Sequence, residues 1–269
     1  MVRTRELLKR TPPGRLVRRA RKLWQLQPIQ TEIDGFEVRI PRRDLPRYLQ
    51  GFEPLTVDWT RHVVATGMTA VDVGAALGVF SLNLWQLVGP SGRVIAIEPA
   101  QSNTKLLALN ARTNNATIEV IRAAASNEDG VREFFLTPSS DSHAFYPHPL
   151  IEASRTVAVR TLRLDSAVEA ADFIKIDVEG AEIEVLEGAE RLLKDRPPLV
   201  VEWVPSCQLA AGNKVGDLPA LLGHLGYKLT VFDEISHAVT TVADTLAAYE
   251  RGDIPIYWYA NICCTSNLP

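Results

Sequence analysis

The chain has few cysteines, and their positions match neither of the spacings typical of cysteine-rich sites. Its 269 residues contain three, of which Cys263 and Cys264 are adjacent and Cys207 stands alone. An odd number with two neighbours on one strand is not a disulfide framework and does not have zinc-ligand spacing. We therefore expect reduced cysteines in a cytoplasmic protein.

Long hydrophobic runs are also missing. No apolar stretch reaches the roughly eighteen residues that span a bilayer, and the N-terminus lacks the hydrophobic region of a signal peptide. We find no internal repeat and no low-complexity linker. The hydrophobic fraction of 46% and the charged fraction of 23% are typical of a soluble protein with a sizeable core. One folded domain is the simplest expectation.

Acidic residues are scarce in the first fifty positions, although the whole chain has a net charge of −3. Residues 1–50 contain 13 Lys and Arg against 5 Asp and Glu, whereas the remainder has a balance of −11. Within this extension, Leu16, Ala20, Leu23 and Trp24 fall near one helical face. The pattern predicts a basic extension, partly helical or flexible, that is either a solvated tail or a peripheral contact with an anionic membrane. Nucleic-acid binding is not expected, because the basic residues are not interleaved with aromatic ones.

The dinucleotide fingerprint G-x-G-x-x-G is absent, but a looser glycine turn follows the first buried strand. That strand is predicted over Ala70–Val73, and Gly74 and Gly78 are separated by three residues before a helix begins. Such a turn lets the backbone approach a ligand and leaves helix N–H groups free. A second strand, Arg93–Ile97, ends in Glu98, whose carboxylate can accept hydrogen bonds from both hydroxyls of a ribose. Together these features predict an adenosine cofactor.

Short apolar runs alternate with amphipathic segments along the chain. This order predicts an α/β fold with a mostly parallel sheet and helices on both faces. The predicted strands are Phe36–Ile40, Ala70–Val73, Arg93–Ile97, Ile118–Arg122, Val131–Leu136, Thr156–Val159, Phe173–Val178, Leu199–Trp203, Lys228–Phe232 and Ile256–Cys263, and the predicted helices are Val57–Ala65, Val79–Val88, Ser102–Thr113, Glu182–Leu193 and Asp217–Leu225.

Two irregular segments are candidates for acceptor recognition. The polar segment Thr137–Ser154 is a plausible lid, and Ser206–Lys214 is expected to be a loop. His143 and His148 lie in the first segment. A loop histidine can act as a base, but we favour the interpretation that both are merely exposed.

A second block places titratable residues in and after an apolar strand. Lys175 would be costly to bury there unless a carboxylate pairs with it, and Asp72 or Glu202 on neighbouring strands are the candidate partners. Asp177 ends the strand, where open α/β sheets bind ligands. Glu179 begins the turn that follows.

Four segments together resemble the FkbM family of S-adenosylmethionine-dependent methyltransferases. The resemblance runs over residues 54–232 and implies a class I Rossmann-like domain, here residues 51–269, with a seven-stranded sheet. It also implies S-adenosyl-L-methionine as cofactor and O-methylation of a glycan, glycolipid or natural-product acceptor. The segments are Val71-Asp72-Val73-Gly74-Ala75, Ile97-Glu98-Pro99, Ile174–Glu182 and Val185–Ala189.

The resemblance also implies which residues hold the cofactor. The glycine turn would pass beneath its methionine part, the acid at the end of the second strand would bind the ribose, and small residues after the third strand would line the adenine. Where the family usually has a polar residue, this chain has Ala76. The implied residues are Asp72, Gly74, Ala75, Gly78, Glu98, Ala124 and Ser126.

For catalysis, Asp177 and Glu179 are the leading candidates for the base, because one of two neighbouring carboxylates can have a raised pKa. Lys175 and Glu202 complete the candidate set. A divalent cation such as magnesium, held by Asp177 and Glu202, is a competing expectation. Two other functions stay open: an NAD(P)-type oxidoreductase and a non-catalytic binding protein with the cofactor fold.

Overall fold

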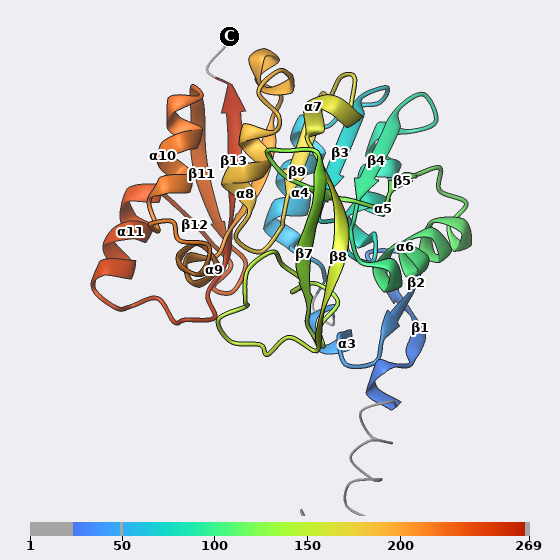
Figure 1. Ribbon diagram of the computed structural model, residues 1–269. Helices are drawn as coiled ribbons and strands as arrows, with labels where there is room; N and C mark the ends of the chain where they lie inside the picture. Colours follow the sequence, from blue (N-terminus) through green and yellow to red (C-terminus); the bar gives the residue numbers. More distant parts are fainter. Residues whose placement is uncertain (1–23, 49–50, 267–269) are drawn as a thin grey trace, which may run out of the picture.

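The computed structural model describes residues 24–48 and 51–266, which fold around one large β-sheet (Figure 1). The sheet has eight strands in the order β12-β11-β13-β10-β9-β3-β4-β5. The five strands from β10 to β5 are parallel, and β13 runs antiparallel to both of its neighbours. The strands are β3 (Thr69–Val73), β4 (Arg93–Ile97), β5 (Glu119–Ile121), β9 (Phe173–Ile176), β10 (Leu199–Trp203), β11 (Tyr227–Asp233), β12 (Ala238–Thr240) and β13 (Ala260–Ser266).

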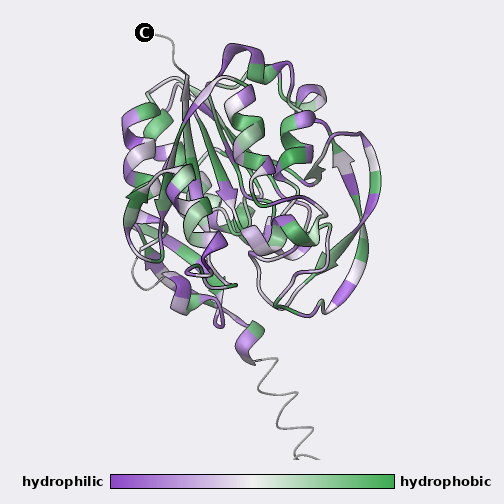
Figure 2. Cartoon of the chain, turned by 90° about the vertical axis from the view of Figure 1, so that its left-hand side faces the viewer, coloured by the Kyte–Doolittle hydropathy of each residue, from purple (hydrophilic) through white to green (hydrophobic). Residues whose placement is uncertain are grey.

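Helices cover both faces of this sheet, as predicted. One layer consists of α4 (Pro54–Val63), α5 (Val79–Val88) and α6 (Gln101–Thr113), and the opposite layer contains α8 (Glu182–Glu187), α10 (Asp217–His224) and α11 (Val242–Glu250). Successive strand residues alternate between the two layers, so Phe173 packs on the α4–α5 side and Ile174 on the other. Apolar residues accordingly concentrate on the central strands (Figure 2).

The predicted count of seven strands is short by one. The additional strand is β12, three residues long, which pairs antiparallel with β11 at the edge of the sheet. The sequence did not predict this strand, because it is short and follows β11 closely. The remaining strands have the class I arrangement that the sequence predicted.

Several boundaries differ from the prediction. The helix expected over Glu182–Leu193 ends at Glu187. Its C-cap residue is Gly188, which lies so close to the carbonyl oxygen of Ser126 that a side chain there would overlap it. A short 3-10 helix follows at Leu192–Asp195. Part of the expected loop Ser206–Lys214 belongs to a helix, α9 (Pro205–Ala210), which starts with a proline in its first turn. Helix α11 was not predicted.

A smaller sheet carries the irregular segment. It has the order β6-β8-β7, with β6 (Ala124–Ala125), β7 (Gly130–Leu136) and β8 (Arg155–Leu162). Strands β7 and β8 form an antiparallel pair, and the segment 137–154 connects them with little regular structure. This sheet stands beside the carboxyl ends of β3 and β4, and its strands β7 and β8 lie in front of the main sheet in Figure 1.

Residues 28–48, which we assigned to the basic extension, pack onto the domain. Strands β1 (Pro28–Ile33) and β2 (Phe36–Pro41) form a hairpin whose inward side chains cluster with residues of the glycine turn and α5. Helix α3 (Leu45–Tyr48) follows. The expected basic helix around Leu16–Trp24 lies almost entirely outside the described residues. Among the described helices, none has the length and apolarity needed to cross a bilayer.

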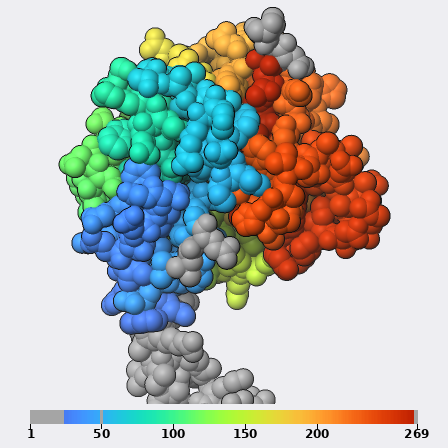
Figure 3. All heavy atoms as spheres, turned by 180° about the vertical axis from the view of Figure 1, so that it is seen from behind, coloured from blue at the N-terminus to red at the C-terminus, as the bar shows by residue number. Residues whose placement is uncertain are grey.

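On the face seen in Figure 3, segments from the two ends of the chain lie side by side. Glu234, after β11, accepts hydrogen bonds from the backbone N–H groups of Leu55 and Thr56 in the first turn of α4. Because a helix N-terminus leaves its first N–H groups without partners, a carboxylate at this place stabilises α4. The two hydrogen bonds join residues that are separated by 179 and 178 positions in the sequence.

Candidate functional site

The glycine turn after β3 is shaped by close contact with the neighbouring strand. Gly74 has a φ of 81°, and a Cβ at this position would overlap the carbonyl oxygen of Asp177. The N–H groups of Gly74 and Ala75 both donate to the carbonyl of Ile97, at 2.9 and 3.2 Å. Only glycine combines this backbone conformation with this approach. The turn therefore brings β3, β4 and β9 together at their carboxyl ends.

Gly78 has a different role from the one that the resemblance implied. It caps the N-terminus of α5 with a φ of 82°, and a Cβ there would meet the Leu107 side chain of α6 at 2.7 Å. It lines neither of the two cavities described below. Gly78 lets α5 and α6 pack closely, while Gly74 and Ala76 face the site.

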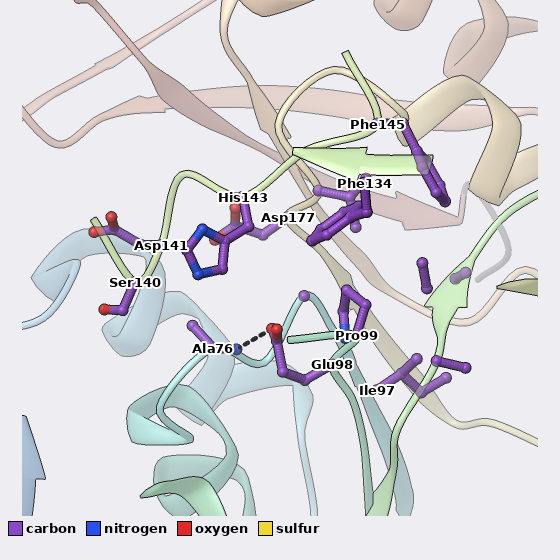
Figure 4. Close-up of a pocket in the computed structure, with 15 residues that line it drawn as sticks. Ala76, Ile97, Glu98, Pro99, Phe134, Ser140, Asp141, His143, Phe145 and Asp177 are labelled. Atoms are coloured by element: carbon purple, nitrogen blue, oxygen red, sulfur yellow. Dashed lines mark hydrogen bonds between the residues drawn. The ribbon is translucent and has the colours of Figure 1, made fainter. Parts of the chain in front are cut away.

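Glu98 is held by backbone donors at the end of β4. Its carboxylate accepts from the N–H of Ala76 at 3.0 Å and from the N–H of Ala100 at 2.7 Å (Figure 4). The amide of Asn103 lies 3.4 Å from the oxygen that Ala100 also contacts. The other oxygen keeps acceptor capacity toward the cavity. Burial raises the pKa of Glu98 to about 8.

Ala76, the residue that departs from the family pattern, supports Glu98 through its backbone. It has a φ of 44°, a left-handed conformation that is uncommon for a residue with a side chain. This conformation turns its N–H toward Glu98. The backbone therefore makes a polar contact here that does not depend on the identity of the side chain.

A first cavity extends from Glu98 beneath the small sheet. Small side chains of Ala123, Ala124 and Ala125 form one wall, and the rings of Phe134 and Phe145 stand edge to face on another, with centroids 5.5 Å apart. Ala124 is thus placed as the resemblance implied. Ser126 is not: it is fully buried outside this cavity and donates to Glu184 at 3.0 Å.

His143 lines the first cavity, contrary to our interpretation that it is merely exposed. Its Nδ1 accepts the backbone N–H of Thr137 at 3.1 Å, so in the neutral ring the proton is on Nε2. Burial lowers the pKa of His143 to about 4, which keeps the ring neutral near pH 7. In Figure 4 the ring lies across the cavity from Glu98. His143 can therefore offer an N–H donor to a ligand there.

The segment 137–154 is tied down over the site. Asp44, which precedes α3, accepts a hydrogen bond from Ser140 at 2.7 Å, and Arg47 of α3 forms an ion pair with Asp141. The carbonyl of Ser140 also accepts from Asn103 at 2.6 Å. The predicted lid position is consistent with these contacts, since Ser140 and Asp141 line the first cavity.

A second and larger cavity, about 630 Å³, lies on the α4–α5 side of the sheet edge. It meets the first cavity at Gly74, Ala76, Asp141 and Asp177, which line both. Carboxylates dominate its charged lining. The acidic residues that line it are Glu53, Asp72, Asp141, Asp177, Glu179, Glu202 and Glu234, and the basic ones among the described residues are Arg47 and Lys175.

Lys175 pairs with a carboxylate that we had not proposed as its partner. Its Nζ lies 2.6 Å from Oδ2 of Asp177, and its side chain is 2% exposed. The expected partners were Asp72, which instead accepts a hydrogen bond from Ser81, and Glu202. Burial alone would lower the pKa of Lys175, but the charges of Asp177, Glu53 and Asp72 outweigh it and raise the pKa above its usual range. The hydroxyl of Ser81 engages Asp72, although Asp72 lies opposite Lys175 in the sheet, and Asp177 pairs with the ammonium instead.

Glu179 and Glu202 are buried beside Asp177. Burial, and then the charge of Asp177, raise the pKa of Glu179 to about 8. The same two causes raise the pKa of Glu202 well above its usual value. Glu179 also has a left-handed backbone, with a φ of 55°, which turns it into the second cavity. Asp177, Glu179 and Glu202 are thus brought together as predicted from the sequence.

One cluster has ligand types suited to a metal. His148 Nε2, Glu179 and the Sγ of Cys207 place ligand atoms within 4.8 Å of one another. However, Nδ1 of His148 accepts backbone N–H groups from Leu150 and Ile151, at 3.1 and 3.0 Å. A neutral ring with Nδ1 as acceptor has its proton on Nε2 and presents no lone pair to a metal there. The cluster therefore suits a carboxylate that accepts a hydrogen bond from the thiol of Cys207, at 3.2 Å, with the Nε2–H of His148 facing it from 4.0 Å.

The magnesium site expected at Asp177 and Glu202 is also disfavoured by the geometry. The ammonium of Lys175 already lies against Asp177 and supplies the positive charge there. A second cation in contact with the same carboxylate would be repelled by the first. Lys175 therefore occupies the electrostatic role that a magnesium ion would have.

Comparison with known proteins agrees with this arrangement. The sequence model of the "Methyltransferase FkbM domain" matches residues 72–229. "Methyltransferase sdnD" of Sordaria araneosa is 25% identical over an alignment of 173 residues, and the match covers 51% of this chain and 66% of that protein. The matched segment thus spans slightly less than two thirds of that relative.

Two solved structures show the same fold at low identity. A Clostridium thermocellum protein provisionally assigned as an rRNA methylase has a TM-score of 0.50 and 14% identity, covering 80% of this chain and 96% of that one. The tRNA (uracil-54, C5)-methyltransferase of Pyrococcus abyssi, in complex with S-adenosyl-L-homocysteine, has a TM-score of 0.50 and 11% identity, covering 88% and 44%. The family match covers more than half of the chain, so this protein belongs to the FkbM methyltransferase domain family.

Proposed function

We propose that the protein is an S-adenosyl-L-methionine-dependent O-methyltransferase. The observation that carries this proposal is the junction of the two cavities at Gly74 and Asp177. One cavity has the small and aromatic walls that suit an adenosine, and the other has the carboxylates that suit proton removal from an acceptor. A cofactor in the first cavity and an acceptor in the second would meet at Asp177.

The residues around the first cavity fit the proposed cofactor. The adenine would lie against Ala123–Ala125 and Phe134, and the ribose hydroxyls would donate to the free acceptor positions of Glu98. Asp72 lines the second cavity, two residues before Gly74 at the junction. Its Oδ1 is fully buried and has no partner among the described residues, so it suits the amino group of a methionine part that reaches this junction. When bound, S-adenosyl-L-methionine supplies the methyl group and its sulfonium loses its positive charge.

Asp177 and Glu179 are the proposed proton acceptors. The acceptor hydroxyl must lose its proton as its oxygen bonds to the methyl carbon, while the carbon–sulfur electron pair passes to sulfur. Lys175 orients the carboxylate of Asp177, which lines both cavities. Glu179 has a pKa raised to about 8, near the pH at which a general base is most effective. Glu202 is a third carboxyl group that lines the second cavity together with Asp177 and Glu179.

The proposed class of acceptor is the one that the resemblance to the family implies. We expect a hydroxyl on a glycan, glycolipid or natural product, at a cytoplasmic site, with the basic residues 1–23 as a candidate contact with anionic membranes. A tritiated-methyl screen of cell fractions tests this directly, and a fraction enriched in membrane lipids tests the contact. Label transferred only to nucleic acid would contradict the acceptor class.

The rival functions differ in ligand. An NAD(P)-type oxidoreductase would bind NAD in the first cavity, and a non-catalytic binding protein would hold S-adenosyl-L-methionine without consuming it. Isothermal titration with S-adenosyl-L-methionine, S-adenosyl-L-homocysteine and NAD distinguishes a methyltransferase from the oxidoreductase. Tight binding of NAD alone would exclude a methyltransferase. Methyl transfer in any fraction would exclude the second.

A further inference from the structure

Three buried carboxyl oxygens that line the second cavity lack a hydrogen-bond partner among the described residues. They are Oε2 of Glu53, Oδ1 of Asp72 and Oε2 of Glu202, in side chains that are 8%, 0% and 8% exposed. A buried acceptor without a donor destabilises the structure that holds it. Three such groups around one space indicate that a ligand supplies the donors.

Three of the remaining acids of this cavity already have partners, and Glu179 accepts a hydrogen bond from the thiol of Cys207. Arg47 pairs with Asp141, Lys175 pairs with Asp177, and Glu234 accepts the N–H groups of α4. If Asp72 receives the amino group of the cofactor, Glu53 and Glu202 are left to face the acceptor. No described cation pairs with either of them.

Glu53 has a conformation that serves the cavity rather than the fold. It is the N-cap residue of α4, with a left-handed φ of 46°, yet its side chain makes no capping hydrogen bond. The side chain at an N-cap position usually accepts an N–H of the first turn when it is short and polar, which glutamate is not. Here Glu234 has taken that task from a distant part of the chain. The strained backbone at Glu53 turns its carboxyl group into the cavity.

We propose that the acceptor carries a protonated amine, and that Glu53 and Glu202 receive it while a neighbouring hydroxyl faces Asp177. An ammonium group has three donors and a positive charge, and so it satisfies both orphan oxygens and neutralises the excess negative charge. A phosphate or carboxylate at this place would be repelled. This inference rests on the proposed O-methyltransferase function.

The raised pKa values agree with this assignment. Burial raises the pKa of Glu53 to about 7, although Lys175 acts in the opposite direction, and burial and Asp177 raise that of Glu202 further. An arriving ammonium would lower both, because it favours the charged carboxylates. Binding would therefore release protons from these two groups.

The test uses an extract of the organism that carries this sequence and tritiated S-adenosyl-L-methionine. One half of the extract is first treated with acetic anhydride in water, which acetylates primary amines and removes their charge. We expect labelling to fall at least about tenfold after acetylation, and the product from untreated extract to bind a cation exchanger at pH 7. Fragmentation of that product should place the label on oxygen.

The outcomes separate this inference from the proposed function. Labelled product that survives acetylation, or that fails to bind the cation exchanger, overturns the amine while leaving O-methylation intact. No labelled product in any fraction, or label on nitrogen, contradicts O-methylation itself.

A stability measurement tests Glu53 without any acceptor. If its carboxyl group serves a ligand, Glu53→Gln should raise the melting temperature of the ligand-free protein, because a buried titratable group without a partner is removed. The matched control is Glu234→Gln, which weakens the cap of α4 and should lower it. A drop for Glu53→Gln as large as that of the control would assign Glu53 to the fold and overturn the inference.

Discussion

Lys175 Nζ lies 2.6 Å from Oδ2 of Asp177 at the junction of the two cavities, and the lysine side chain is 2% exposed. This pair explains why an apolar strand contains a lysine. The ammonium offsets part of the negative charge of the surrounding acids and fixes the carboxylate that we place beside the reacting groups. Breaking the pair is expected to affect the chemistry more than the binding of the cofactor.

Asp177→Asn should reduce methyl transfer at least about a hundredfold, because the amide cannot take the proton of the acceptor. The affinity for S-adenosyl-L-methionine should stay within about tenfold, which is roughly 1.4 kcal/mol. Transfer of label and isothermal titration measure the two effects. Asp58→Asn, whose side chain is 68% exposed, is the control and should change neither. Full activity of Asp177→Asn would remove this residue from the mechanism.

The Gly74→Ala variant should unfold more easily than the Gly212→Ala variant, in which a glycine with a similar backbone conformation is replaced. Gly74 and Gly212 have φ values of 81° and 86°, but only at Gly74 would a Cβ overlap another residue, the carbonyl oxygen of Asp177. We expect Gly74→Ala to cost about 2 kcal/mol more than Gly212→Ala. Urea denaturation compares the two. Equal losses would mean that the conformation alone, and not the close approach, requires glycine.

His143→Ala should weaken the binding of S-adenosyl-L-methionine and S-adenosyl-L-homocysteine alike, by roughly five- to thirtyfold, since one hydrogen bond and ring contacts are lost. The loss should be the same at pH 6 and pH 8, because the pKa of about 4 keeps His143 neutral over this range. Titration calorimetry at both values is the measurement. His224→Ala, at the exposed end of α10, serves as the control. An effect that appears only below pH 7 would point to a charged His143.

Glu98 should make cofactor affinity depend on pH. Its pKa of about 8 means that raising the pH ionises the carboxylate, which then accepts hydroxyl donors better, so affinity should rise from pH 6 to pH 9. The stability of the ligand-free protein should change in the opposite direction. A folded-state pKa above the ordinary 4.5 gives stability that is present at low pH and is lost as pH rises toward about 8.

Glu98→Gln should flatten both dependences, and Glu119→Gln, half exposed on β5, should leave them as in the parent protein. Calorimetric titration and melting curves at each pH give the comparison. Affinity that falls with rising pH in the parent protein would contradict the assigned role of Glu98.

Removal of divalent cations should leave methyl transfer unchanged. Lys175 already supplies the positive charge at Asp177, and His148 directs a proton rather than a lone pair toward Glu179. We expect activity after exhaustive EDTA treatment to stay within about twofold of the untreated enzyme. If activity is lost and added magnesium restores it, the magnesium site at Asp177 and Glu202 would again be the better explanation.

Local patterns determined most of the fold and the approximate location of the site. The alternation of apolar strands with amphipathic helices predicted the sheet and its two helix layers, and Gly74, Glu98 and Asp177 could be placed because each ends a strand or follows one directly. These features depend on residues close in sequence, for which spacing fixes orientation. The β12 edge strand was missed because it is only three residues long, and no pattern in the sequence predicted α11.

The tertiary structure alone decided which groups meet across the site. The spacing did not distinguish Asp177 from Asp72 as the partner of Lys175. It also did not predict that Ser126 donates to Glu184, or that His143 lines the first cavity instead of lying at the surface. It also decided that Glu234 caps α4 and leaves Glu53 free to face the acceptor. Such contacts join residues that are distant in the chain, and their energies depend on burial and on nearby charges, which only the packed structure supplies.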